Sequence, residues 1–196
     1  ENNEYYTDVD GVLFDKEMKT LITYPTGKAE KKYIIPNGVE KICDHAFDDN
    51  KQLTKVEFSD SIVDIGDWAF DSCVNLSVVV LNDGIKNIGI DAFNDCENLK
   101  KINLPDGLLT IGDGAFAHCE SLSPSIIIPD TVTSIGKWAF SGCVGLISVK
   151  LPAGLSVIKK GLFNGCECLS SITIPDSVTA IEDEAFRYCH ELSSVV

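Results

Sequence analysis

The side chains best suited to metal binding or redox chemistry are the eight cysteines, six of which recur at intervals of 23 or 24 residues. The recurring series is Cys73, Cys96, Cys119, Cys143, Cys166 and Cys189. Zinc needs ligands that converge tetrahedrally, and a linear series does not converge. Strands stacked ~4.8 Å apart would permit disulfides, but one small thiol per repeat also packs well in a core, and we favour reduced thiols. Cys43 and Cys168 lie outside the series, and we expect them to be the most exposed.

No residue pattern typical of an enzyme is present. The sequence lacks the nucleophile motif G-x-S-x-G, the zinc motif H-E-x-x-H and a phosphate-binding P-loop. His45, His118 and His190 fall at different repeat positions, so we expect surface side chains that do not act together. We therefore predict a non-enzymatic protein that needs no cofactor.

One acidic cluster suggests a weak calcium site. Asp48 and Asp49, then Asp71, then Asn94 with Asp95 follow the phenylalanines of three successive repeats. If the repeats stack about 5 Å apart, these side chains would offer several oxygens, which are the ligands that Ca²⁺ prefers. A hydrated acidic edge explains the same residues, and we favour that interpretation.

The elements that position these residues follow from a strict internal repeat, which is typical of stacked, solenoid architectures. The first series of positions is Phe47, Phe70, Phe93, Phe116, Phe140, Phe163 and Phe186. The second series is Ile35, Phe58, Leu81, Leu104, Ile128, Leu151 and Ile174. Both series step by 23 residues except for one step of 24 in the same stretch, which locates a one-residue insertion near residues 123–125.

Each repeat reads approximately L-x-x-I-x-I-P-D-G-V-x-x-I-G-x-x-A-F-x-x-C. The alternating I-x-I part predicts a strand with one buried face, and the proline and glycine that follow predict a tight turn. In the A-F-x-x-C-x-x-L part, apolar residues three apart suggest one or two turns of α- or 3₁₀-helix. One repeat cannot bury its own apolar face, so the repeats must stack.

These blocks resemble the BspA-type leucine-rich repeats of bacterial surface proteins, and the resemblance covers residues 32–196 as seven repeats. It implies an α/β, β-rich, right-handed leucine-rich-repeat solenoid with short strands and short helical or 3₁₀ turns. Residues 1–31, with Asp10–Phe14 and Leu21–Pro25, resemble a hairpin-like insert between such repeats and would act as a cap. Val195-Val196 stand where an eighth repeat would begin, so we expect a piece of a longer protein.

The predicted binding surface is the outward position between the two buried strand residues. This row is Ile34, Glu57, Val80, Asn103, Ile127, Lys150 and Thr173. It mixes apolar, acidic, basic and polar types and runs across the open sheet face that solenoids use for binding, although β-propensity alone could explain its β-branched members. Trp68 and Trp138 share the position before the Ala-Phe pair and either anchor a partner or, as we favour, shield the turn.

Composition restricts the partners. The net charge of −14 disfavours nucleic acid and anionic membrane surfaces, and no apolar run is long enough to insert into a membrane. We expect an extracellular or cell-surface module that binds a protein or glycan, and the resemblance implies attachment to host extracellular matrix or to other cells. The alternative is a structural spacer that presents another domain. We expect a monomer or an end-to-end dimer.

Overall fold

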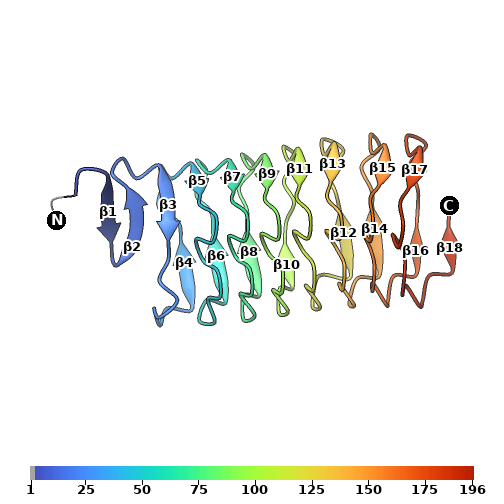
Figure 1. Ribbon diagram of the computed structural model, residues 1–196, viewed down its shortest axis with the longest axis horizontal. Helices are drawn as coiled ribbons and strands as arrows, with labels where there is room; N and C mark the ends of the chain where they lie inside the picture. Colours follow the sequence, from blue (N-terminus) through green and yellow to red (C-terminus); the bar gives the residue numbers. More distant parts are fainter. Residues whose placement is uncertain (1–2) are drawn as a thin grey trace.

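The structure, a computed structural model that describes residues 3–196, is an elongated solenoid whose strands form two rows (Figure 1). The first row contains β4 (Lys32–Ile34), β6 (Lys55–Glu57), β8 (Val78–Val80), β10 (Lys101–Ile102), β12 (Ser125–Ile127), β14 (Ser148–Lys150), β16 (Ser171–Ile172) and β18 (Ser194–Val195). The second row contains β5 (Lys41–Ile42), β7 (Asp64–Ile65), β9 (Asn87–Ile88), β11 (Thr110–Ile111), β13 (Ser134–Ile135), β15 (Val157–Ile158) and β17 (Ala180–Ile181). Hydrogen-bonded neighbours within each row are parallel. Each repeat therefore contributes one strand to each row.

An antiparallel unit at the N-terminal end continues the second row. Strands β1 (Tyr6–Val9), β2 (Val12–Asp15) and β3 (Thr20–Thr23) pair antiparallel in sequence order, and β3 then pairs parallel with β5. The turn between β1 and β2 holds Asp10 and Gly11 at φ of 51° and 76°, the positive values that a tight Asp-Gly hairpin requires. Strand β3 therefore covers the end of the second row through its backbone bonds to β5, and the β1–β2 hairpin extends the sheet beyond it.

The phenylalanines form one continuous file through the interior, as the repeat spacing predicts. Neighbouring rings from Phe47 to Phe186 lie 4.5–5.9 Å apart between centroids, with interplanar angles of 16° or less. Tyr24, which the repeat pattern does not identify, extends the file with its ring 5.2 Å from Phe47. All rings from Tyr24 to Phe163 are buried. Offset stacking of this kind adds to the free energy that ring burial provides.

The predicted helical turns are wrong: residues 3–196 contain no α-helix or 3₁₀-helix, so the fold is a β-solenoid and not an α/β repeat. The A-F-x-x-C stretches form successive turns. In the first repeat, the N–H groups of Ala46 and Asp48 donate to carbonyls three residues earlier. The N–H groups of Phe47 and Asp49 instead donate to Ala69 and Asp71 of the next repeat. This alternation replaces the internal ladder of a helix with bonds between turns.

Two positions in every repeat adopt left-handed backbone conformations, which explains why a helix cannot form there. They flank the Ala-Phe or Leu-Phe pair and have φ between 48° and 73°. The residues before the pair are His45, Trp68, Asp91, Gly114, Trp138, Gly161 and Glu184. The residues after it are Asp49, Ser72, Asp95, His118, Gly142, Gly165 and Tyr188. Only a few of these are glycine, so the sequence did not reveal them.

The one-residue insertion divides the first row into two four-stranded sheets. Strands β4, β6, β8 and β10 form one sheet, and β12, β14, β16 and β18 form the other. The break falls at residues 123–125, where the repeat spacing places the insertion. An extra residue displaces the hydrogen-bonding groups of one turn relative to the next. The sequence therefore located the break, although it did not predict that the sheet would be interrupted.

A glycine column allows the turns to approach closely beside the second row. A Cβ atom added to Gly89 or Gly112 would lie about 2.5–2.6 Å from the backbone of the preceding turn, a distance that real Cβ atoms essentially never show. The second row is interrupted between β13 and β15, where this column changes from Gly136 to Lys159. Pairing resumes between β15 and β17 with Glu182 in the column, so the glycines permit the closest approach without being needed for every pairing.

Replacing Gly112 by alanine is expected to destabilise the chain. The new methyl group must displace the carbonyl of Gly89, and overpacking of this kind costs about 1–3 kcal/mol of unfolding free energy. Urea denaturation followed by circular dichroism measures the loss. Gly154→Ala is the matched control, since a Cβ atom there meets no heavy atom within 4 Å. Equal stabilities of the two variants would contradict the close-approach argument.

Candidate binding face

The predicted row lies on the outward face of the first strand row. None of its seven residues is buried, whereas the strand residues between the outward positions, such as Val56, Val79 and Ile126, are buried. Ile34, Val80 and Ile127 are 67%, 40% and 65% exposed. The sheet register aligns Ile34, Glu57 and Val80 directly, and it aligns Ile127 with Lys150. The face thus presents β-branched side chains at regular intervals.

The break at the insertion separates the row into two parts. Ile34, Glu57, Val80 and Asn103 belong to the N-terminal part, and Ile127, Lys150 and Thr173 belong to the C-terminal part. Polar members of the row make local contacts: the Asn103 amide accepts from the Leu81 N–H and donates to the Leu81 carbonyl, both at 3.3 Å. The apolar members therefore offer most of the surface that is free for a partner.

The charged members of the row are paired with neighbours on the same face. The Glu57 carboxylate lies 2.5 Å from the Lys55 ammonium, and the Lys150 ammonium lies 3.6 Å from the Asp130 carboxylate. Exposed ion pairs of this kind contribute little stability, so both pairs remain available to rearrange when a partner binds.

The cysteine series lines the interior, where each thiol donates a hydrogen bond to the preceding turn. The acceptors are the carbonyls of the phenylalanines one turn earlier, with Sγ–O distances of 3.1–3.2 Å for all six thiols. Asn50 occupies this column in the first repeat, and its Oδ1 accepts from the N–H groups of Gln52 and Leu53. The thiols therefore contribute weak S–H···O bonds between turns besides filling space.

Burial sets the chemistry of these thiols. It raises the pKa of Cys73 and of Cys143 to about 12 and raises the pKa of Cys96 and Cys119 well above the ordinary value. A neutral thiol is a poor nucleophile and metal ligand. Cys168 is exposed, as predicted, and Cys43 is half-buried. The buried series therefore serves the architecture and is not a reactive site.

The acidic cluster is held by protein donors. The Asn94 amide donates to Asp71 at 2.8 Å and to Asp95 at 2.9 Å. Asp49 lies 2.5 Å from the Lys51 ammonium, and Asp48 lies 3.0 Å from His45 Nδ1. Burial, assisted by the charges of Asp48 and Asp95, raises the pKa of Asp71. Within residues 3–196, no group of three or more His, Cys, Asp or Glu side chains is placed to hold a metal, so the calcium hypothesis gains no geometric support.

His45, His118 and His190 are all exposed, as the sequence predicts, and the two tryptophans lie in the turns beside the phenylalanine file. The His45 and Trp68 rings stack with centroids 5.1 Å apart. The Trp138 ring covers Gly161, where an added Cβ would lie 2.0 Å from the indole, and the Lys160 ammonium lies 5.9 Å from its centroid. Both tryptophans are half-buried.

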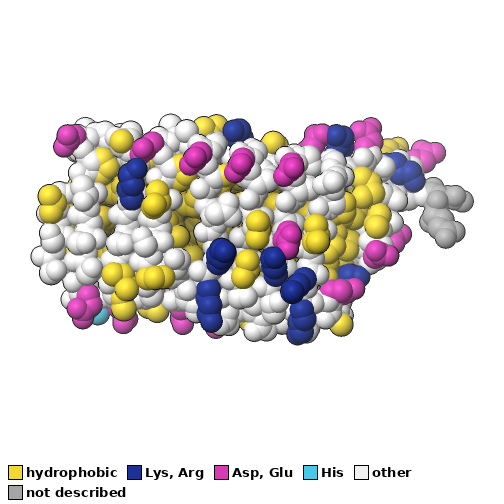
Figure 2. All heavy atoms as spheres, turned by 180° about the vertical axis from the view of Figure 1, so that it is seen from behind, with side chains coloured by type: hydrophobic (Ala, Val, Ile, Leu, Met, Phe, Trp, Pro, Cys, Tyr) yellow, Lys and Arg dark blue, Asp and Glu magenta, His cyan; other side chains and the backbone are white. Residues whose placement is uncertain are grey.

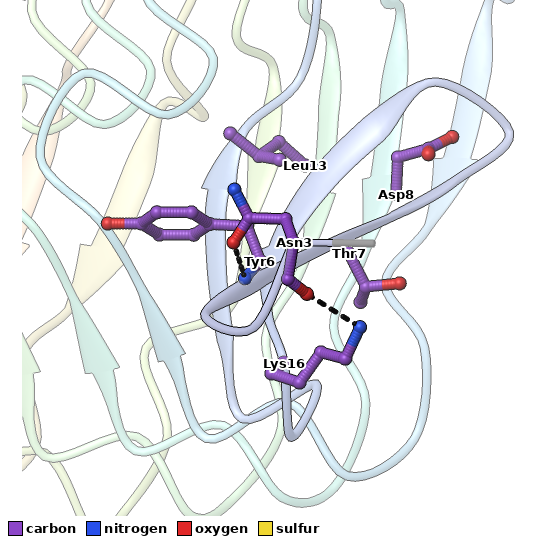
Figure 3. Close-up of a pocket in the computed structure, with 6 residues that line it drawn as sticks. All are labelled: Asn3, Tyr6, Thr7, Asp8, Leu13 and Lys16. Carbon is purple, nitrogen blue, oxygen red and sulfur yellow. Dashed lines mark hydrogen bonds between the residues drawn. The ribbon is translucent and has the colours of Figure 1, made fainter. Parts of the chain in front are cut away.

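Two surface depressions lie at the N-terminal end of the described chain. One, of about 240 Å³, is lined by Asn3, Tyr6, Thr7, Asp8, Leu13 and Lys16 (Figure 3). The Lys16 ammonium donates to the Asn3 carbonyl at 2.9 Å, and the Asp8 side chain lies apart from it. A second depression, of about 260 Å³, is lined in part by Tyr24, Tyr33 and Ile34. Residues 3–196 include no helix that could span a membrane.

The sequence analysis missed one feature of this face, a group of lysines beside the predicted row. Lys32 and Lys55 are aligned across β4 and β6, and Lys101 occupies the same column on β10. Comparing residues 23 apart would have revealed them. The predicted row contains only the single outward position between the two core positions of each strand.

Comparisons with known proteins agree with this geometry. The family model described as the BspA type leucine rich repeat region matches in six copies over residues 27–125 and 118–196. Among solved structures, a Treponema pallidum leucine-rich repeat protein is 32% identical, with a TM-score of 0.84 over 89% of this chain and 82% of that one. No curated protein is similar enough to add a functional comparison.

Two other solved structures are longer than this chain. A Bacteroides ovatus leucine-rich repeat protein is 29% identical, with a TM-score of 0.82 over 99% of this chain and 52% of that one. A leucine-rich cell surface protein from Faecalibacterium prausnitzii is 30% identical, with a TM-score of 0.80 over 100% of this chain and 53% of that one. The chain thus spans about half the length of these two proteins.

Because its thiols are buried, we expect the folded chain to lose stability in alkali. Because burial raises their pKa, they stay protonated in the folded chain while an unfolded chain ionises above about pH 8.5. The stability that the neutral buried thiols contribute is therefore fully present below that pH and is lost as the pH rises above it. Urea denaturation between about pH 8 and 10 measures this effect as the slope of the unfolding free energy against pH. For Cys119→Ala the unfolding free energy should fall less steeply than for the original chain, by up to ~1.4 kcal/mol per pH unit.

Cys168→Ala is the control for this measurement, since it removes an exposed thiol. Its unfolding free energy should follow that of the original chain across the whole range. Identical pH slopes for Cys119→Ala and the original chain would show that the buried thiol does not couple folding to pH.

Proposed function

The chain belongs to the BspA-type leucine-rich-repeat family, and from that premise we propose that it is a non-enzymatic recognition module. It binds a protein or glycan through the outward face of the first strand row, formed by Ile34, Glu57, Val80, Asn103, Ile127, Lys150 and Thr173. Leucine-rich-repeat proteins generally act through interactions with other proteins, and stacked repeats create the extended surfaces that such binding uses.

The observation that carries the proposal is the exposure of large apolar side chains on this face in both parts of the row. About two thirds of the surface of Ile34 and of Ile127 is exposed to solvent. Their neighbours along the chain, Ile35, Ile126 and Ile128, are buried in the core. Exposed apolar side chains that recur on one face are typical of contact sites. The charged members, Glu57 and Lys150, would then form the polar surroundings of these anchors.

We place the module at the cell surface or outside the cell, with host extracellular matrix or other cells as the structures to which it attaches. Support comes from the similar protein of Faecalibacterium prausnitzii, which is described as a leucine-rich cell surface protein. A spacer that presents another domain is the competing function. It requires that this segment bind no partner of its own, so a binding assay separates the two.

Replacing Val80 and Ile127 together by threonine is expected to weaken binding at least tenfold. Burial of two such side chains by a partner contributes about 1.5–3 kcal/mol each, and ~1.4 kcal/mol is a tenfold change in affinity. Threonine keeps the β-branched shape, so the melting temperature should shift by less than about 3 °C. Surface plasmon resonance against a panel of matrix proteins and glycans measures the effect.

Ile90→Thr is the matched control, because Ile90 has the same 40% exposure as Val80 but lies outside both strand rows. It should bind every panel member as the original chain does. If the double variant also retains full binding, the strand face is not the site. If the original chain binds nothing in the panel, the spacer function gains support.

A further inference from the structure

Five lysines form a compact group on the N-terminal part of the strand face. This lysine patch consists of Lys31, Lys32, Lys55, Lys100 and Lys101. Lys32, Lys55 and Lys101 share one register column across the sheet, with Val78 of β8 between the last two. Lys31 and Lys100 directly precede two of these residues and are exposed. Since neighbouring strands lie ~4.8 Å apart, the column from Lys32 to Lys101 spans roughly 14 Å.

The patch has a local charge opposite to that of the molecule. It holds five of the 16 Lys and Arg residues of a chain whose net charge is −14. Lys55 is paired with Glu57, but across residues 3–196 no carboxylate lies within 4.0 Å of the other four ammonium groups. Dark blue side chains gather low on the N-terminal half of this face, while acidic side chains follow its upper edge (Figure 2). An anionic partner would therefore be attracted to this part of the surface and repelled elsewhere.

The small side chains between the lysines are held by hydrogen bonds between turns. The Thr54 hydroxyl donates to the Lys31 carbonyl at 2.9 Å, and the Ser77 hydroxyl donates to the Thr54 carbonyl at 3.0 Å. These bonds fix small side chains between the long ones. Lysine ammonium groups bind anions as mobile point charges without the planar geometry of arginine. The patch is therefore suited to single anionic groups that recur along an extended chain.

From this arrangement we propose that the lysine patch binds an acidic, sulfated polysaccharide. The outward positions of β4, β6, β8 and β10 carry no aromatic side chain on which a nucleobase could stack. Sulfate groups repeated along a sugar chain match lysine ammonium groups repeated along stacked strands. The proposal rests on the proposed function in treating this face as a binding surface, but it depends on different residues.

The experiment compares two variants of equal charge by isothermal titration with dextran sulfate in about 50 mM NaCl. The patch variant carries Lys31→Gln, Lys32→Gln, Lys100→Gln and Lys101→Gln. The control variant carries Lys41→Gln, Lys86→Gln, Lys137→Gln and Lys160→Gln. The original chain and the control should bind with similar affinity, and the patch variant should bind at least about tenfold more weakly. Binding should also weaken as NaCl is raised, and unsulfated dextran should not bind.

Several results would overturn the proposal. These are no binding of dextran sulfate by the original chain, an equal loss in both variants, or equally tight binding of polyglutamate, which would indicate an acidic protein partner. The Val80→Thr, Ile127→Thr variant separates this proposal from the proposed function, because it keeps all five lysines. If that variant retains every interaction while the patch variant loses dextran sulfate, the proposed row fails and the lysine patch stands.

Discussion

The structure depends on a single requirement: each turn must satisfy its backbone hydrogen bonds with the turns beside it. Between residues 3 and 196, no turn contains a helix or a hairpin that could satisfy those groups internally, apart from the β1–β2 hairpin. Three sets of bonds meet the requirement, one in each strand row and one along the Ala-Phe turns. Because unpaired buried backbone groups are costly, one turn fixes the register of the next. The phenylalanine file and the thiol column then fill the space that this stacking encloses.

Places where the register is disturbed show how strict the requirement is. One additional residue near position 124 is enough to end the first sheet, although the phenylalanine rings on either side, Phe116 and Phe140, remain 5.3 Å apart. The interior therefore continues across a break in the strand row. Burial of apolar side chains tolerates a small displacement, whereas hydrogen bonds between strands do not. Apolar burial and inter-strand hydrogen bonds therefore stabilise the same stack, but only the hydrogen bonds require a strict register between turns.

The sequence predicted the features that depend on spacing and missed those that depend on backbone conformation. Repetition at 23 residues was sufficient for the phenylalanine file, the insertion and the outward row. It failed in the A-F-x-x-C stretch, because apolar residues three apart suit a helix as well as a series of turns. The difference lies in the positive φ values at residues such as His45, Trp68 and Ser72. Tryptophan and serine rarely adopt a left-handed conformation, and histidine, which adopts it more often, does not fill either column consistently, so the turns could not be recognised.

The same logic explains why a function can be placed on this scaffold with little effect on its stability. Inward positions are committed to stacking: the thiols donate to the preceding turn, and the glycines beside β9 and β11 have no room for a side chain. Outward side chains make few contacts that hold the turns together. Positions such as Ile34, Val80 and Lys101 can therefore differ in residue type without changing the register. Any row of outward residues is carried at strand spacing across the face. The stacking therefore fixes the spacing of outward side chains, whereas the residue type at each turn decides which contact that turn offers.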